Sequence, residues 1–381
     1  MDDLFVVFDK IPTKKDGGLV ATYVDFVREL SSEYNIKFVS IFRSEPTDIP
    51  AFMGLEFITL FDIPLDNRFY HAPSLLVRGK VREAGFALVS ALRFFSRIPV
   101  SRRKTRMLLE GKKVVAVAPA AAMFLSPSVR YILEIHINFE YFWGDGLLGR
   151  AQASMIPPAA LTVFRNKSDA RKGSELFPST YMYNTFDDAG IEADELPSAL
   201  THRAVFVGRL AEQKNPLMLL ECARRVRERF EDFTLDVFGD GEMRAQIEGR
   251  ILEMGLDGVV NLHGFTDDKS VYQGHDLLWL TSKYEGFGLV IIEAAANMVP
   301  TVTTDWGEAV SEVVLNGQTG FIADDLDEFV DKSCEVMASL ELRNRLARNA
   351  RDNYEQRFSP TIHKAQWLRI INSVYPSEGA C

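Results

Sequence analysis

Short apolar runs alternate with helical patterns along most of this 381-residue chain. The runs at residues 204–207, 235–238 and 277–280 read as buried strands, and each leads into a helical pattern. Strands that alternate with helices in this way imply right-handed crossovers and a parallel sheet. The alternation therefore predicts an α/β fold built from doubly wound sheets.

The same alternation begins at the N-terminus, where residues 4–8 and 36–42 read as strands. A chain of this length favours two domains. We place a first Rossmann-like domain at residues 1–187 and a second at residues 188–358, followed by a C-terminal helix at residues 359–381. In doubly wound sheets ligands bind at the carboxyl ends of the strands, so functional residues are expected there.

The composition argues against several classes of protein. The net charge of −10 argues against general nucleic-acid binding. We expect no membrane-spanning helix and no secretory signal, because the apolar runs are short and the N-terminus lacks a basic segment. The cysteines, Cys222, Cys334 and Cys381, show no pattern, which is typical of a reducing compartment. We therefore expect a cytoplasmic protein, and the spacing of its residues predicts no metal site.

Residues 277–297 combine a buried strand, a glycine turn and an apolar helix. Gly286 and Gly288 form the turn, and the free N–H groups and dipole of the helix start attract phosphate there. Glu285 and Glu293 flank this turn. Because Glu293 lies among apolar residues, it needs hydrogen-bond donors, which sugar or ribose hydroxyls would supply.

Simpler readings of these charged residues stay open. Glu293 can pair with a core Arg or Lys while Glu285 is solvated. Arg209 and Lys214 lie between a strand end and a helix start, where two cations can neutralise a departing diphosphate. Cations on surface loops are, however, usually just solvated.

The stretch Glu285-Gly-Phe-Gly-Leu-Val-Ile-Ile-Glu293 resembles the carboxylate pair of retaining GT-B glycosyltransferases of family four, the glycosyl transferases group 1. The resemblance implies two facing Rossmann-like domains with the active site in the cleft between them, and a last helix that crosses back to the first domain. It also implies that Glu285 holds the donor sugar and Glu293 the ribose. The turn residues that would hold the diphosphate are Gly286, Phe287, Gly288 and Leu289.

Shorter matches extend the resemblance across the second half of the chain. Gly208-Arg209-Leu210 followed by Lys214 resembles the phosphate clamp of the family. His263-Gly264-Phe265 matches the region that borders the nucleotide base, although His263 can equally be a capping or core residue.

Two features of the first half match the family by position. Gly17-Gly18, after the first strand, resembles the glycine pair over the donor phosphate, although turn chemistry alone also explains such a pair. His136, at the end of the strand at residues 131–136, matches a histidine that contacts the transferred sugar, although a histidine there is often structural. Glu134 points to the same face of that strand, and its role stays open.

The chain departs from the family pattern at several positions. Thr185 replaces the glycine of a tyrosine-asparagine-glycine stretch. Trp306 replaces the first glycine, and Ser311 the proline, of the glycine-glycine-proline-glutamate stretch. That loop lies near the donor sugar in the family, which leaves room for an atypical donor.

The resemblance implies a retaining hexosyltransferase that uses a nucleotide-sugar donor, most simply a UDP-sugar, and no cofactor. Its catalytic residues would be Glu285, His136, Arg209 and Lys214. The acceptor would be a glycan or a lipid-linked glycan in cell-surface polysaccharide synthesis. Residues 76–113 are basic and amphipathic, which is typical of a peripheral contact at the inner face of a plasma membrane, but equally of a core helix with a solvated face.

Two other classes of function stay open. One is a nucleotide-sugar-binding GT-B protein without activity, which slow release of UDP from UDP-sugars would argue against. The other is a different two-domain α/β enzyme, such as an epimerase or a phosphorylase. A phosphorylase of the GT-B kind needs pyridoxal phosphate, so the absence of the absorbance of this cofactor would argue against it. The fold alone does not decide between them.

Overall fold

The structure is a computed structural model that describes residues 1–13, 18–44, 49–64, 89, 93–136, 139, 153–191 and 195–376. The chain divides into two compact units, and each is described by itself. Unit 1 comprises residues 1–165, 169–182 and 364–381, and unit 2 comprises residues 166–168 and 183–363.

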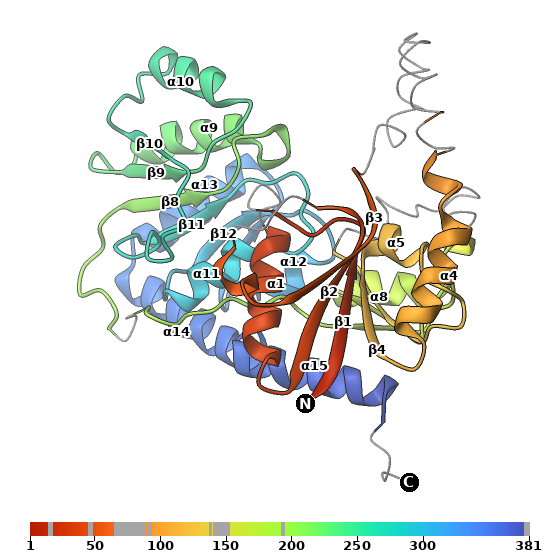
Figure 1. Ribbon diagram of the computed structural model, residues 1–381. Coiled ribbons are helices and arrows are strands. Elements are labelled where there is room, and N and C mark those ends of the chain that lie inside the picture. Colours follow the sequence, from red (N-terminus) through yellow and green to blue (C-terminus); the bar gives the residue numbers. More distant parts are fainter. Residues whose placement is uncertain are drawn as a thin grey trace. The chain divides into compact units, whose positions relative to one another are not determined.

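Unit 1 is built on a seven-stranded sheet in the order β3-β2-β1-β4-β5-β6-β7 (Figure 1). All neighbouring strands are parallel. The strands are β1 (Asp2–Phe8), β2 (Tyr34–Arg43), β3 (Glu56–Pro64), β4 (Lys113–Val117), β5 (Ile132–Glu134), β6 (Leu161–Phe164) and β7 (Ser179–Tyr181). The helices between them are α1 (Gly18–Leu30), α4 (Ile98–Leu109), α5 (Ala118–Ala122) and α8 (Lys167–Gly173), with a short 3₁₀ turn, η2 (Pro50–Phe52).

Both faces of this sheet are buried, as a parallel sheet requires. Along β1, Phe5 and Val7 enter one apolar cluster, whereas Leu4 enters the other. The second cluster also contains Trp367 of the C-terminal helix α15 (Pro360–Val374), whose ring meets Phe26 edge-on with ring centroids 5.0 Å apart. From residue 364 onward the chain therefore belongs to unit 1.

Unit 2 is built on a six-stranded parallel sheet in the order β10-β9-β8-β11-β12-β13. The strands are β8 (Arg203–Val207), β9 (Thr234–Phe238), β10 (Val260–Gly264), β11 (Leu277–Leu280), β12 (Thr301–Thr304) and β13 (Gly320–Ala323). The helices are α9 (Pro216–Arg227), α10 (Arg244–Glu253), α11 (Leu289–Ala296), α12 (Val310–Val313), α13 (Leu326–Met337) and α14 (Leu340–Arg357), with a 3₁₀ turn, η4 (Glu212–Lys214).

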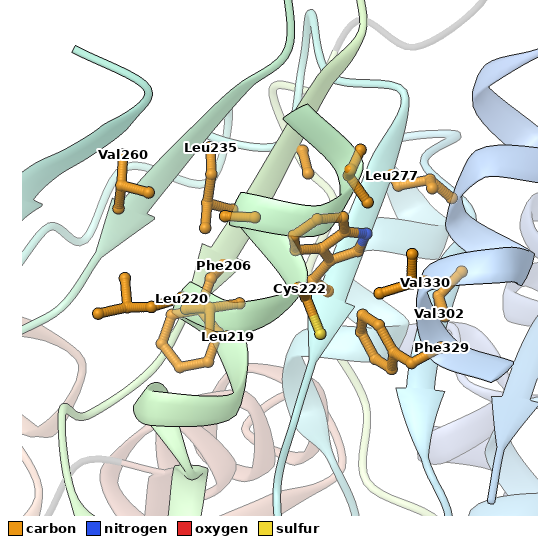
Figure 2. Packing of buried hydrophobic residues seen from close by; sticks show 14 of the residues in the cluster. Phe206, Leu219, Leu220, Cys222, Leu235, Val260, Leu277, Val302, Phe329 and Val330 are labelled. Atoms are coloured by element: carbon orange, nitrogen blue, oxygen red, sulfur yellow. The ribbon is translucent and has the colours of Figure 1, made fainter. Parts of the chain in front are cut away.

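The core of unit 2 lies between the sheet and helices α9 and α13. Figure 2 shows Phe206 and Leu235 of the strands beside Leu219 of α9, with Phe329 of α13 on the other side of the cluster. The indole of Trp279 stacks on Phe233 and meets Phe329 edge-on. This packing fixes the central strands β8 and β11, which pair with each other. Their carboxyl ends lead into Gly208 and Arg209 after β8 and into residues 281–288 after β11.

The predicted fold class is confirmed: both sheets are parallel and have the strand order of a Rossmann-like domain. Two local features bear on the loops of unit 2. Asn215, directly before α9, is left-handed with φ of 50°, and its side chain makes no capping hydrogen bond. His263 lies within β10. Within the described residues, no helix is long and apolar enough to cross a membrane.

Candidate functional site

The order of the strands in unit 2 reverses between β8 and β11, and ligands of such sheets bind outside the carboxyl ends at this point. The chain leaves β8 through Gly208 and exposed Arg209, and it leaves β11 through residues 281–288. The two loops are fastened together: Gln213 donates from its side-chain amide to the carbonyl of Tyr284 at 2.9 Å. The fold thus brings together the two loops on which the sequence placed the phosphate clamp and the sugar carboxylate.

Lys214 and Glu285 form an ion pair across these two loops. The Nζ atom of Lys214 lies 2.5 Å from Oε1 of Glu285, and the hydroxyl of Ser282 donates to the same oxygen at 2.5 Å. The two charged side chains are 15% and 8% exposed. The two predicted residues, Lys214 and Glu285, are therefore in contact at the switch point. Ser282, which the sequence analysis did not identify, orients the carboxylate of Glu285 through its hydrogen bond.

The helix α11 begins beside this pair at Gly288, which has a left-handed φ of 79°. A Cβ atom at this position would lie 3.0 Å from Cδ1 of Ile291 and 3.5 Å from the Trp306 ring, so the left-handed backbone is the main reason for glycine here. The first N–H groups of a helix have no acceptor within it, and they favour an anion there. The side chain of Phe287 is buried and packs against Tyr183 and Phe358, so only its backbone is available to a ligand.

Glu293 lies in α11 and accepts a hydrogen bond from the hydroxyl of buried Tyr272. Burial raises the pKa of Glu293 above its usual value, while the Tyr272 hydrogen bond and the charges of Lys214 and Lys269 act in the opposite direction. A phenol, rather than the core cation of the simpler reading, is therefore its hydrogen-bond donor in this structure. The sequence reading missed Tyr272, because nothing in the local pattern links it to Glu293.

The Gly239-Asp-Gly241 turn after β9 packs against the loop that carries Arg209. A Cβ atom on Gly239 would lie 1.9 Å from the carbonyl oxygen of Gly208, and one on Gly241 would lie 2.3 Å from that of Leu210. The absence of side chains lets the two loops pair through backbone hydrogen bonds, from Gly208 to Phe238 among others. These glycines therefore allow the close packing of the two loops.

His263 is tied to a buried carboxylate that the sequence reading missed. Its Nε2 atom lies 2.7 Å from Oδ1 of Asp236 on β9, and its ring stacks on Phe238. Burial would raise the pKa of Asp236, but hydrogen bonds from His263, Arg203 and His275 outweigh it and hold that pKa well below its usual range. His263 is thus oriented from within the protein. The following residues, Gly264 and Phe265, end β10 and expose the Phe265 ring.

In unit 1, His136 lies two residues beyond β5, with a mostly buried ring. Its Nε2 atom is 3.3 Å from Oε1 of Glu134, so the two-residue spacing does place these side chains together. Gly18 is the first residue of α1, whereas Gly17 lies outside the described residues. Most of the basic segment before residue 93 also lies outside them. Among residues that the structure describes, no group of three or more His, Cys, Asp or Glu side chains is arranged to hold a metal ion.

Comparison with known proteins adds to this geometry. Residues 199–353 match the family described as Glycosyl transferases group 1. Unit 2 contains a group 1 glycosyl transferase domain. The match covers β8 to most of α14 and therefore includes Arg209, Lys214, Glu285 and Glu293.

Curated relatives are similar to part of this chain. Poly(glycerol-phosphate) alpha-glucosyltransferase of Bacillus subtilis is 32% identical over 140 residues, which are 36% of this chain and 20% of that protein. An alpha-1,4-N-acetyl-D-galactosaminyltransferase of Campylobacter jejuni, which acts on a diNAcBac-PP-undecaprenol-linked glycan, is 26% identical over 45% of this chain and 48% of its own. The chain thus spans less than half of the length of each of these two relatives.

Solved structures extend the likeness to the whole fold. The crystal structure of Anabaena HepE in complex with UDP and glucose matches 98% of this chain and 100% of its own, with a TM-score of 0.70 and 15% identity. At this identity the likeness concerns the fold, which is GT-B with two Rossmann-like domains, one of them the glycosyl transferase domain.

Proposed function

We propose that the chain is a retaining glycosyltransferase that moves a hexose from a UDP-sugar to a glycan or lipid-linked glycan in cell-surface polysaccharide synthesis. One observation carries the proposal: the Lys214–Glu285 pair lies at the switch point of a group 1 domain, and Glu285 is on the loop that leads to the helix start at Gly288. A cation and a helix start suit a diphosphate, and a carboxylate suits sugar hydroxyls.

Lys214 and Glu285 form an ion pair in this structure. Donor binding would separate their roles, with Lys214 turning to the diphosphate and Glu285 to the hydroxyls of the sugar. As the bond between the anomeric carbon and the diphosphate oxygen breaks, its electron pair goes to that oxygen. Arg209, Lys214 and the N–H groups of Phe287, Gly288 and Leu289 would stabilise the negative charge that develops there.

In this proposal the acceptor hydroxyl attacks the same face of the anomeric carbon, and its proton passes to the departing diphosphate. Glu293 holds the ribose, and His136 contacts the transferred sugar. His263, Gly264 and Phe265 border the base, while Gly17 and Gly18 approach the donor phosphate from the first domain. These roles need no metal, so we expect full activity in the presence of a chelator.

The names of the similar proteins support the choice of donor, stereochemistry and acceptor. HepE was solved with UDP and glucose, and the Bacillus subtilis relative is named as an alpha-glucosyltransferase. An α-linked product from a UDP-sugar whose own linkage is α means retention. The Campylobacter jejuni relative acts on an undecaprenol-linked glycan, which supports a lipid-linked acceptor.

The test measures release of the nucleoside diphosphate (UDP, GDP or ADP) from a panel of UDP-, GDP- and ADP-sugars by the wild-type protein and by Glu285→Gln. We expect turnover with a UDP-sugar, and a loss of about 10²–10³-fold in Glu285→Gln, because a group that acts in the transition state is removed. Lys283→Ala is the matched control: it lies on the same loop, pairs with Glu212 at the surface, and should leave the rate unchanged. Wild-type turnover by Glu285→Gln would refute the assigned role, and tight UDP-sugar binding without turnover would identify a non-catalytic binding protein.

We also propose that helix α4 contacts an anionic membrane surface. Its exposed face carries Val100 and Met107 together with Arg103 and Arg106, which combines apolar and basic groups as membrane-surface helices do. Arg103→Glu with Arg106→Glu should abolish cosedimentation with vesicles of anionic lipid. The control, Arg345→Glu with Arg348→Glu on α14, makes the same change in net charge at two other exposed positions and should leave cosedimentation intact. Equal loss in both double variants would refute a specific role of α4.

A further inference from the structure

A cluster of buried polar side chains surrounds His136 in unit 1. Tyr23 of α1 and Glu134 of β5 are fully buried, and Arg165, directly after β6, is 4% exposed. The hydroxyl of Tyr23 donates to Oε2 of Glu134, and the guanidinium of Arg165 forms an ion pair with Oε1 of the same carboxylate. Removing charges from water is unfavourable unless they are paired and hydrogen-bonded, and in this cluster the Glu134 carboxylate has both a cation and a hydroxyl donor.

His136 meets this cluster through one edge of its ring. Its Nε2 atom lies 3.4 Å from Nη2 of Arg165 and 3.3 Å from Oε1 of Glu134. The ring also packs against Tyr23, with centroids 5.7 Å apart. Within the part of the chain that the structure describes, no side chain is paired with Nδ1. The ring is therefore held by Nε2, and Nδ1 is the nitrogen left for a ligand.

The charge of its neighbours determines which nitrogen carries the proton. A guanidinium can only donate hydrogen bonds, and Nη2 of Arg165 is within hydrogen-bonding distance of Nε2 of His136, at 3.4 Å. Oε1 of Glu134 lies 3.3 Å from Nε2, but among the described residues it has no hydrogen-bond partner. Burial lowers the pKa of Arg165 to about 10, against the opposing effects of Tyr23 and Glu29, so it remains a cation at neutral pH. Burial also lowers the pKa of His136 to about 3, which keeps the ring neutral. A neutral ring that accepts at Nε2 carries its proton on Nδ1.

We propose that Arg165 is a positioning residue that fixes His136 in the neutral Nδ1–H tautomer, so that His136 presents a hydrogen-bond donor to an oxygen of the bound sugar. This rests on the proposed function for the identity of the ligand. It specifies the chemistry of recognition: the sugar must offer an oxygen lone pair, from a hydroxyl or a carbonyl group, at this position. His136 would not act as a general base, because its accepting nitrogen is occupied by Arg165.

The test reads the tautomer directly in the full-length protein without ligand. In ¹⁵N-histidine-labelled wild-type protein, the His136 signals, assigned from their loss in His136→Asn, should show a protonated Nδ1 and an unprotonated Nε2 from about pH 6 to 8. A protonated Nε2, or a charged ring in this range, would overturn the proposal. Because no donor is present, this result is independent of the proposed function, which fails separately if UDP-sugars do not bind.

Two pairs of variants sharpen the test. Arg165→Met should move the proton to Nε2, facing Glu134, whereas Tyr23→Phe, which removes the other donor to Glu134, should leave it on Nδ1. In activity, His136→Asn places an amide near the position of Nδ1 and His136→Gln near that of Nε2. We expect His136→Asn to retain about tenfold more kcat/KM, as the gain of one hydrogen bond allows. Equal or reversed activities would contradict the proposal even if Arg165→Met does not fold.

Discussion

The two sheets have the same strand order but carry opposite kinds of polar cluster at their carboxyl ends. In unit 1 the Glu134–Arg165 pair is closed to solvent. In unit 2 the Lys214–Glu285 pair keeps part of its surface exposed. A closed ion pair suits the task of holding a neighbouring ring in one state, whereas a partly open pair can exchange its partner for a charged ligand. In our proposals, the same topology supports a positioning cluster in one domain and a binding cluster in the other.

The largest expected effect tests this contrast through stability. Arg165→Met should lower the free energy of unfolding by about 3–5 kcal/mol, because it leaves the Glu134 charge buried and unpaired. Lys214→Met removes a cation from a carboxylate that Ser282 still binds and that solvent reaches, so we expect a loss of about 2 kcal/mol or less. Urea denaturation of both variants measures the difference. Equal losses of unfolding free energy in the two variants would show that the Glu134–Arg165 pair is no more dependent on its cation than the Lys214–Glu285 pair.

The contrast also separates what the sequence could predict from what it could not. The alternation of strands and helices was sufficient for both sheets, and local motifs at strand ends located Lys214 and Glu285 on loops that do meet. The partners of buried groups were not predictable. Tyr272 reaches Glu293, and Arg165 reaches Glu134, from segments that only the folded chain brings together. A motif records which residue needs a partner, but the partner depends on tertiary packing.

A smaller effect concerns Glu293, whose donor is a phenol rather than a cation. The pKa of the Glu293 carboxyl is raised above 4.5, so the folded protein binds the carboxyl proton more tightly than the unfolded chain does. The protonated carboxyl therefore stabilises the fold at low pH, and this stabilisation is lost as pH rises through the raised pKa. The ribose hydroxyls need the carboxylate form, so UDP affinity should fall as pH decreases through the same range. Tyr272→Phe removes a hydrogen bond that lowers the pKa of Glu293. The decrease in UDP affinity should therefore begin at a higher pH in this variant than in the wild-type protein.

Isothermal titration calorimetry with UDP across this pH range measures the shift. Tyr284→Phe is the matched control, because the Tyr284 side chain is 61% exposed on the loop before α11 and, among the described residues, Glu293 accepts its hydrogen bond from Tyr272 and not from Tyr284. A pH profile that Tyr272→Phe and Tyr284→Phe leave equally unchanged would mean that Glu293 does not bind the ribose in its ionised form.

The smallest expected effect concerns Trp306, which stands where the family pattern has glycine. The indole lies against Gly288 at the start of α11, and its N–H donates to Oγ1 of Thr303 at 3.2 Å. Trp306→Phe keeps a ring against Gly288 and removes only this hydrogen bond, so it should cost about 1 kcal/mol of stability and leave UDP affinity unchanged. Trp306→Ala removes the ring as well and should weaken UDP binding, because the start of α11 loses its support. If both variants bind UDP equally well, the ring does not shape the binding cluster, and the departure from the family pattern concerns only the packing of the sheet.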